Sequence, residues 1–258
     1  MPTQFFIYCI PRTGSYHLSS LLDSAPDVVC HGELFKPERL ELRGVYKSRI
    51  QVTTVQERDS APLDYLGSIR DLEPDRNFGF KLFPQHANRV PAIRALFKDR
   101  DWKIIILARD PIETYASMMR ARETMVWTKR KLKGLLANLA WRVRRIFKNE
   151  PPPKVHFTPE SLDGFAHQYN RFVERCRGLR KQRDRVIVAH YSQLNDPGFQ
   201  SFLLNFVGSA ADPLSLKSKY EKQYEGTLAD GFDNWSELQD HIAMTKPFLS
   251  LPPATYRG

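Results

Sequence analysis

Five short apolar runs divide the sequence and predict a parallel β-sheet. Most of them lack strict alternation of apolar and polar positions and carry β-branched or aromatic residues, which is typical of strands buried on both faces. The runs are QFFIYCI at 4–10, DVVCHG at 27–32, FGFKLF at 78–83, WKIIILAR at 102–109 and RVIVAHY at 185–191.

Helical patterns lie between or after these runs. The longest has apolar residues at helical spacing, and Thr158-Pro159 before it supplies a cap followed by proline at the first helical position. Alternating strands and helices predict an α/β protein with a central, mainly parallel sheet flanked by helices, in which ligands collect at the carboxyl ends of the strands. The helices are expected at 16–22, 90–97, 112–119 and 165–176.

Length and composition favour one globular domain. The chain has 258 residues, of which 41% are hydrophobic and 26% charged, so neither disorder nor a membrane-embedded protein is indicated. We expect a single domain over 1–258, with a basic helical insertion at about 120–150. Three scattered cysteines are too few for a disulfide framework, and QFFIYCIP after Met1 does not resemble a leader. These features favour a cytoplasmic protein.

The net charge of 39 − 29 = +10 is concentrated in one segment. Between Arg120 and Lys148, ten basic residues and one acidic residue give 10 − 1 = +9. As a helix, this segment has a leucine-rich stripe opposite its basic residues, and such a helix can lie on a membrane or guide an anionic or membrane-associated acceptor. The alternative is packing on the domain or on a second subunit of a homodimer. We expect no nucleic-acid partner, since binding one usually requires a basic face.

A candidate phosphate loop, Pro11-Arg12-Thr13-Gly14-Ser15-Tyr16-His17, follows the first strand and leads into a helix. A tight turn before a helix N-terminus gathers backbone N–H groups around an anion, with the helix dipole behind them. The loop is not of the Walker type, because no lysine follows its glycine. The alternative is an ordinary strand-to-helix turn.

A second phosphate element is suggested by Arg109 and Ser117. Arg109 ends the fourth strand, and Ser117 lies eight residues later in a helix that Pro111 can start. A guanidinium fork and a hydroxyl together suit a phosphate. Taken singly, each residue is better explained as an arginine in a surface salt bridge or a helical serine without a special role.

Together, the two elements resemble those of sulfotransferases that use 3′-phosphoadenosine 5′-phosphosulfate (PAPS). The resemblance continues at 31–35, 79–83, 196–197 and 206–208, spans about 4–210, and is strongest to the bacterial branch with trehalose and other carbohydrate sulfotransferases. One departure is Tyr191-Ser192, where many relatives have an acidic residue after the tyrosine, so we assign that segment no catalytic role. The segment YEGTLADGFDNWSEL matches the family only loosely.

The resemblance implies a P-loop-like three-layer fold and assigns the nucleotide contacts. Arg109 and Ser117 would hold the 3′-phosphate, and no metal is expected. The 5′-phosphosulfate would be held by Arg12, Thr13, Gly14, Ser15, Tyr16 and His17.

Glu33 is the candidate general base. Transfer to an alcohol requires a group that takes the hydroxyl proton, and Glu33 follows the second strand and matches the glutamate proposed as base in related carbohydrate enzymes. The alternative is that it caps the next helix. His31, Lys81 and His86 are weaker catalytic candidates at or beyond strand ends. Lys81 requires an anionic partner inside its apolar strand, and we place His86 at the surface or in the acceptor pocket.

These inferences predict a sulfotransferase that moves the sulfuryl group of PAPS to a hydroxyl of an acceptor, most readily a carbohydrate or glycolipid. The alternatives are an ATP-dependent phosphotransferase and a non-catalytic anion- or membrane-binding module. Acceptor specificity is expected in variable loops at about 36–75 and 120–160.

Overall fold

The computed structural model describes residues 2–124, 154–182, 184–220 and 226–252, and their contacts divide the chain into two compact units. The first comprises Met1–Arg109, Arg171–Ser218 and Ser250–Gly258, and the second comprises Asp110–Asn170 and Lys219–Leu249. That both fold together as the one expected domain stays a prediction. Most of the basic segment, from 125 onward, lies outside the described residues.

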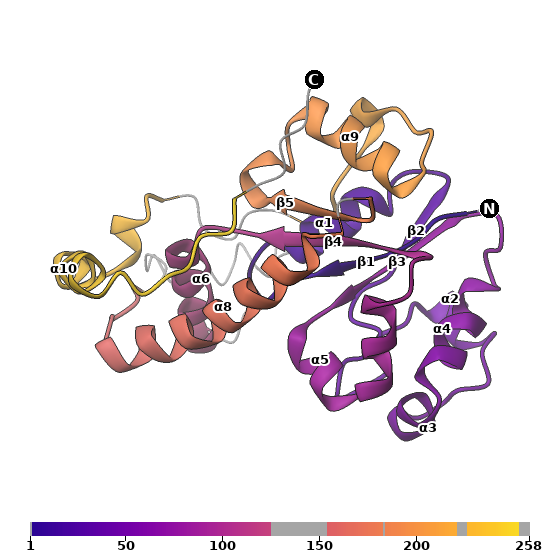
Figure 1. The fold of residues 1–258 in the computed structure, drawn as a ribbon, viewed down its shortest axis with the longest axis horizontal. Helices are drawn as coiled ribbons and strands as arrows, with labels where there is room; N and C mark the ends of the chain where they lie inside the picture. The colour runs from indigo at the N-terminus through magenta and orange to yellow at the C-terminus, as the bar shows by residue number, and fades with distance from the viewer. Residues whose placement is uncertain (1, 125–153, 183, 221–225, 253–258) are drawn as a thin grey trace, which may run out of the picture. The chain divides into compact units, whose positions relative to one another are not determined.

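A five-stranded parallel sheet forms the centre of the first unit (Figure 1), and its strands are ordered β2-β3-β1-β4-β5. Every strand falls within one of the predicted apolar runs except for Asn77 at the start of β3, so the prediction of a parallel α/β sheet is confirmed. The strands are β1 (Gln4–Tyr8), β2 (Val28–Cys30), β3 (Asn77–Leu82), β4 (Trp102–Ala108) and β5 (Val186–His190).

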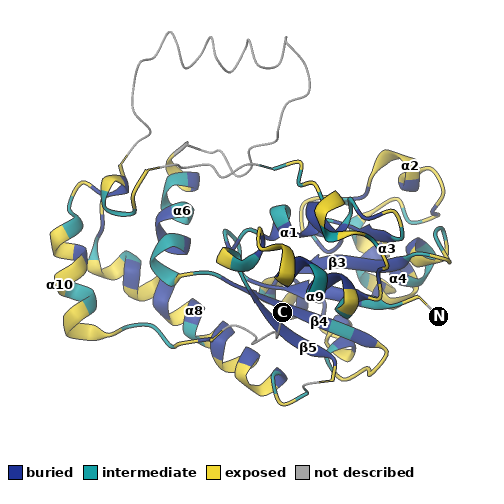
Figure 2. Cartoon of the chain, turned by 90° about the horizontal axis from the view of Figure 1, so that it is seen from above, coloured by how far each residue is buried: buried dark blue, intermediate teal, exposed yellow. Residues whose placement is uncertain are grey.

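Both faces of the sheet are covered, which explains why the apolar runs do not alternate. Phe5 and Ile7 of β1 pack in one buried cluster with α1 (Ser15–Leu22) and α9 (Pro197–Val207). Phe6 and Tyr8 face the other way, toward Phe97 of the 3₁₀ helix η1 (Pro91–Phe97). In Figure 2 the strands are accordingly coloured as buried. The first unit therefore has the three layers, helix, sheet and helix, that the resemblance implied.

Short helices occupy the region between β2 and β3, which the sequence suggested only as a variable loop. They are α2 (Gly44–Lys47), α3 (Val55–Ser60) and α4 (Pro62–Arg70), and α5 (Pro84–Arg89) follows β3. Thr54 and Glu57 form a capping box at the start of α3. The helix expected at 90–97 forms as a 3₁₀ helix, η1, with proline at its first position.

One buried arginine ties α3 to the loop after β2. The side chain of Arg58 is fully buried and donates from Nη1 to the backbone oxygens of Leu34 at 3.0 Å and Lys36 at 2.9 Å. It also forms an ion pair with Asp59 at 2.8 Å. The turn that follows Glu33 is therefore held by a helix distant in sequence.

The second unit contains α6 (Pro111–Thr124), the first part of α8 (Pro159–Leu179) and α10 (Trp235–Thr245). The predicted cap of α8 is confirmed, since the Thr158 hydroxyl accepts a hydrogen bond from the Ser161 N–H at 3.3 Å. Pro111 starts α6, as expected, and Asp110 accepts the Glu113 N–H at 2.9 Å. Among the helices of the described ranges, none is both long and apolar enough to cross a bilayer.

Candidate active site

The phosphate loop is a tight turn formed by two left-handed residues. Arg12 has φ of 73° and Gly14 has φ of 92°, and α1 begins immediately afterwards at Ser15. Left-handed conformation is uncommon for a residue such as arginine and often marks a functional turn. A helix that begins after glycine presents its first backbone N–H groups and the positive end of its dipole to whatever lies before it. The loop therefore has the geometry expected for binding an anion.

Two side chains brace this loop. A Cβ atom on Gly14 would lie 2.3 Å from Cδ2 of Tyr191, so the tyrosine ring packs directly against the glycine. The Arg109 guanidinium lies 4.5 Å from the centroid of the same ring and donates to the Arg12 carbonyl at 3.2 Å. Sequence analysis assigned Tyr191 no catalytic role, and its packing position could not be read from its motif.

The remaining loop residues have different environments. Thr13 is fully buried, and its hydroxyl donates to the Ile10 carbonyl at 2.9 Å. Ser15 is also buried, while His17 is only half-buried and contacts the Asn195 side chain at 3.1 Å. Ser117 lies half-buried on α6 in the second unit, whereas Arg109 belongs to the first. That both hold one phosphate stays a prediction.

Glu33 is the centre of a buried polar cluster three residues beyond the end of β2. Its Oε1 accepts a hydrogen bond from the Tyr16 hydroxyl at 3.0 Å and lies 3.3 Å from Nζ of Lys81. Its Oε2 is 3.8 Å from Nε2 of His86. The residue is only 8% exposed. We call Glu33, Tyr16, Lys81, His86 and Glu41 the Glu33 cluster.

The alternative role for Glu33, capping the next helix, is wrong. The next helix, α2, begins only at Gly44, and its cap position is occupied by Arg43. Glu33 instead lies in a turn, where its carbonyl accepts the Lys36 N–H at 3.0 Å. Its carboxylate is therefore available for the side chains of the cluster.

Lys81 has the anionic partner that its position in an apolar strand required. The side chain is fully buried, pairs with Glu33, and places Nζ 3.0 Å from the centroid of the Tyr16 ring. Burial lowers the pKa of Lys81, although the Glu33 carboxylate opposes this change. The ammonium is therefore stabilised by one carboxylate and one aromatic face.

His86, a member of the Glu33 cluster, and His31 are both buried but have different neighbours. His86 was expected at the surface or in the acceptor pocket, but it is 1% exposed, and burial lowers its pKa to about 4. The surface placement is wrong because His86 packs on the Phe83 ring and against Glu33. His31 is buried between the Tyr46 and Phe78 rings, where burial lowers its pKa to about 3. Neither His31 nitrogen has a hydrogen-bond partner among the described residues.

Glu41 is a member of the cluster that sequence analysis did not identify. Its Oε1 lies 3.1 Å from the Tyr16 hydroxyl, and its Oε2 pairs with Lys36 at 3.3 Å and Arg39 at 3.6 Å. No motif marks this glutamate, which lies in a region expected to vary. Only the fold shows that it approaches the same phenol as Glu33.

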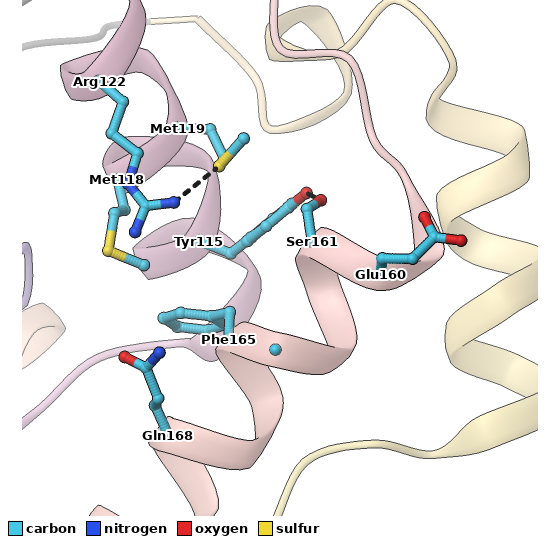
Figure 3. Close-up of a pocket in the computed structure, with 9 residues that line it drawn as sticks. Tyr115, Met118, Met119, Arg122, Glu160, Ser161, Phe165 and Gln168 are labelled. Carbon is cyan, nitrogen blue, oxygen red and sulfur yellow. Dashed lines mark hydrogen bonds between the residues drawn. The ribbon is translucent and has the colours of Figure 1, made fainter.

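A separate pocket of about 220 Å³ lies in the second unit between α6 and α8 (Figure 3). Tyr115, Met118 and Phe165 line it, and the Arg122 side chain donates to the Met119 sulfur at 4.0 Å. None of the site residues expected from the sequence lines this pocket. Within the described ranges, no three His, Cys, Asp or Glu side chains gather as metal ligands would.

Comparison with known proteins gives consistent results. Residues 4–197 match the sulfotransferase family. Nodulation protein H of Rhizobium tropici is 24% identical over 250 residues, covering 94% of this chain and 90% of that protein. Nodulation protein H of Rhizobium meliloti (strain 1021) is 23% identical, covering 94% and 92%.

Among solved structures, the sulfotransferase domain of the Synechococcus PCC 7002 olefin synthase has a similar fold, with a TM-score of 0.51 and 15% identity. The similarity covers 98% of this chain and 91% of that one. The family match includes the phosphate loop, all five strands and the Glu33 cluster. This enzyme therefore belongs to the sulfotransferase family.

Proposed function

We propose that this sulfotransferase uses PAPS as its donor and a hydroxyl of a carbohydrate or glycolipid as its acceptor, with Glu33 as the general base. One contact carries the proposal: the hydroxyl of Tyr16, in the first turn of the helix that the phosphate loop starts, lies 3.0 Å from Oε1 of Glu33. A buried carboxylate is thus joined to the anion-binding turn through one side chain. PAPS is the donor that the family generally uses.

The donor nucleotide would be held by residues of the chain at two places. Backbone N–H groups at the start of α1, together with Arg12, suit the 5′-phosphosulfate. Arg109, already held against the loop by its contact with the Arg12 carbonyl, suits the 3′-phosphate with Ser117. The Tyr191 ring, packed against Gly14, would hold the turn in its left-handed conformation.

PAPS supplies a sulfuryl group whose bond to the bridging phosphate oxygen breaks as the acceptor oxygen bonds to sulfur. Glu33 takes the proton of the acceptor hydroxyl during this in-line approach. The Lys81 ammonium holds Glu33 Oε1 in place and would add positive charge to a site in which negative charge develops on the leaving phosphate. His86, neutral because of burial, limits the movement of Oε2.

The acceptor class rests on two observations. The motifs at 31–35 and 79–83 resemble those of carbohydrate sulfotransferases, and the segment from Arg120 to Lys148 has a net charge of +9. We propose that this segment attracts an anionic or membrane-associated acceptor. A cytoplasmic location is part of the same proposal.

The nucleotide assignment is tested by calorimetric titration with 3′-phosphoadenosine 5′-phosphate, ADP and ATP. The 3′-phosphorylated nucleotide should bind far better, and Arg109→Ala should weaken its binding about 10- to 100-fold through loss of a charge-assisted contact. Arg100→Ala, an exposed arginine in the same unit, is the matched control. Equal affinity of the wild type for nucleotides with and without the 3′-phosphate would overturn the assignment.

The base is tested with labelled PAPS and a panel of carbohydrate and glycolipid acceptors. Glu33→Gln should keep nucleotide binding and lose about 10²–10⁴-fold in turnover. Glu38→Gln, an exposed glutamate in the same loop, should keep wild-type turnover. Wild-type turnover of Glu33→Gln would exclude Glu33 as the base.

A further inference from the structure

The Tyr16 hydroxyl lies between two carboxylates, and it has one proton to donate. The phenol oxygen is 3.0 Å from Oε1 of Glu33 and 3.1 Å from Oε1 of Glu41. A phenol O–H makes one strong donated hydrogen bond, so the two carboxylates compete for it. Burial and both carboxylates raise the pKa of Tyr16, and the phenol therefore keeps its proton.

Glu41 is well placed to remain ionised in this competition. Lys36 at 3.3 Å and Arg39 at 3.6 Å pair with its other oxygen, Oε2. Burial by itself would raise the pKa of Glu41, but Lys36, Lys81 and the Tyr16 hydrogen bond outweigh burial and hold that pKa below its usual range. A charged Glu41 is a strong acceptor for the phenol proton.

The other groups that face Glu33 come from three elements. Lys81 on β3 donates to Oε1, and His86 on α5 faces Oε2. Cys9, at the end of β1, is buried, and burial raises its thiol pKa to about 12, so it stays neutral. Tyr16 differs from these groups because its hydroxyl also contacts a second carboxylate, that of Glu41.

We propose that Glu41 is a positioning residue that draws the Tyr16 proton away from Glu33 and so keeps Glu33 basic. The inference rests on the proposed role of Glu33 as general base. When Tyr16 donates to Glu41, Oε1 of Glu33 is held, among the described residues, by Lys81 alone. When Tyr16 donates to Glu33, the added hydrogen bond stabilises the Glu33 carboxylate and makes it a weaker proton acceptor.

Gly32 makes the approach of Glu41 possible. A Cβ atom at this position would lie 2.9 Å from Oε1 of Glu41, closer than real side-chain contacts allow. The neighbour it meets is the end of a flexible side chain, so Gly32→Ala should displace the Glu41 carboxylate and leave the backbone in place. This variant moves Glu41 without altering its charge.

The first experiment measures the pH profile of kcat for Glu41→Gln. The acid limb should move to lower pH, because Glu33 gains the full Tyr16 hydrogen bond. The rate above this limb should fall about threefold to tenfold, as a weaker base takes the proton. Binding of 3′-phosphoadenosine 5′-phosphate should not change, and Glu38→Gln should behave as wild type. An unshifted acid limb would overturn the proposal.

A double-mutant cycle with Tyr16→Phe tests the route of the effect. If Glu41 acts through the phenol, Glu41→Gln should change kcat less than twofold in the Tyr16→Phe background, where no phenol proton is left to redirect. A threefold to tenfold fall in that background, as expected in the wild type, would overturn the proposal. Gly32→Ala should give the same direction of change as Glu41→Gln, which keeps the test decisive if Glu41→Gln folds poorly.

The outcomes separate this inference from the proposed function. Wild-type turnover of Glu33→Gln would remove Glu33 as the base, and the role of Glu41 would fall with it. Loss of turnover in Glu33→Gln, with a wild-type pH profile in Glu41→Gln and Gly32→Ala, would overturn the role of Glu41 alone.

Discussion

The phosphate loop and the Glu33 cluster follow the first two strands in the chain but are built in opposite ways. The loop depends on backbone conformation, with Arg12 and Gly14 left-handed within three consecutive residues. The cluster depends on side chains from α1, β3, α5 and the loop after β2, which meet around one carboxylate. The phosphate loop should therefore be most sensitive to changes in backbone geometry. The Glu33 cluster should be most sensitive to the loss of one of its charged groups.

The largest effect is expected from breaking the charge balance with Lys81→Met. The substitution leaves Glu33 largely buried without its cationic partner, and removing one member of a buried ion pair costs about 3–5 kcal/mol in the free energy of unfolding. Urea denaturation measures this loss. Lys98→Met, at an exposed lysine, is the control and should change little.

The double variant Lys81→Met/Glu33→Gln sharpens this result. Removing both charges leaves no unpaired ion, so the double variant should regain at least half of the lost stability. A Lys81→Met protein as stable as wild type would show that the cluster does not depend on charge balance.

A smaller effect is expected from adding one methyl group to each region. Gly14→Ala places a side chain at φ of 92° and against the Tyr191 ring, so stability should fall by about 1–2 kcal/mol, with at least tenfold weaker binding of 3′-phosphoadenosine 5′-phosphate. In Gly32→Ala, the added Cβ atom would meet only the end of the Glu41 side chain. Stability and nucleotide binding should therefore both stay near the wild-type values. Calorimetry and urea denaturation compare the two variants, and equal losses would contradict the distinction between backbone and side-chain construction.

The smallest effect concerns His31, which precedes Glu33 by two residues yet packs in the core. Its pKa of about 3 lies below the ordinary value of about 6.5, so below pH 6.5 the unfolded chain binds a proton that the folded chain does not. The free energy of unfolding should therefore decrease as the pH falls through this window, by about 1 kcal/mol between pH 6.5 and one pH unit lower. His31→Phe should remove this part of the slope.

Denaturation between about pH 7 and pH 5 checks the histidine prediction. His167→Phe, at an exposed position on α8, should keep the wild-type slope. If His31→Phe also kept the wild-type slope, the His31 ring would be charged in the folded protein, which would contradict the prediction.

The two regions also differ in how far the sequence predicts them. The strands and the phosphate loop were predictable, because an uninterrupted apolar run and a glycine turn are local signals. The contact of Lys81 with an anion followed from the cost of an unpaired buried ammonium. Glu41 and Tyr191 carry no such signal, since their positions depend on how distant segments pack.

The burial of His86 shows the same limit. A histidine beyond a strand end is compatible with a solvent-facing ligand group or a core residue, and the sequence does not decide between them. The decision comes from Phe83 and Glu33, which enclose the ring in the folded chain. The three short helices between β2 and β3 were missed because each is too brief for helical periodicity to be evident.

The contact of Arg58 with the turn after Glu33 couples the local opening of two segments. Its guanidinium supplies donors to the Leu34 and Lys36 carbonyls, so any fluctuation that undocks α3 strips both of these partners from the turn at once. The turn and α3 should then open as one cooperative unit in native-state hydrogen exchange. Glu33 precedes this turn directly, so its carboxylate should be no more mobile than the docked helix α3.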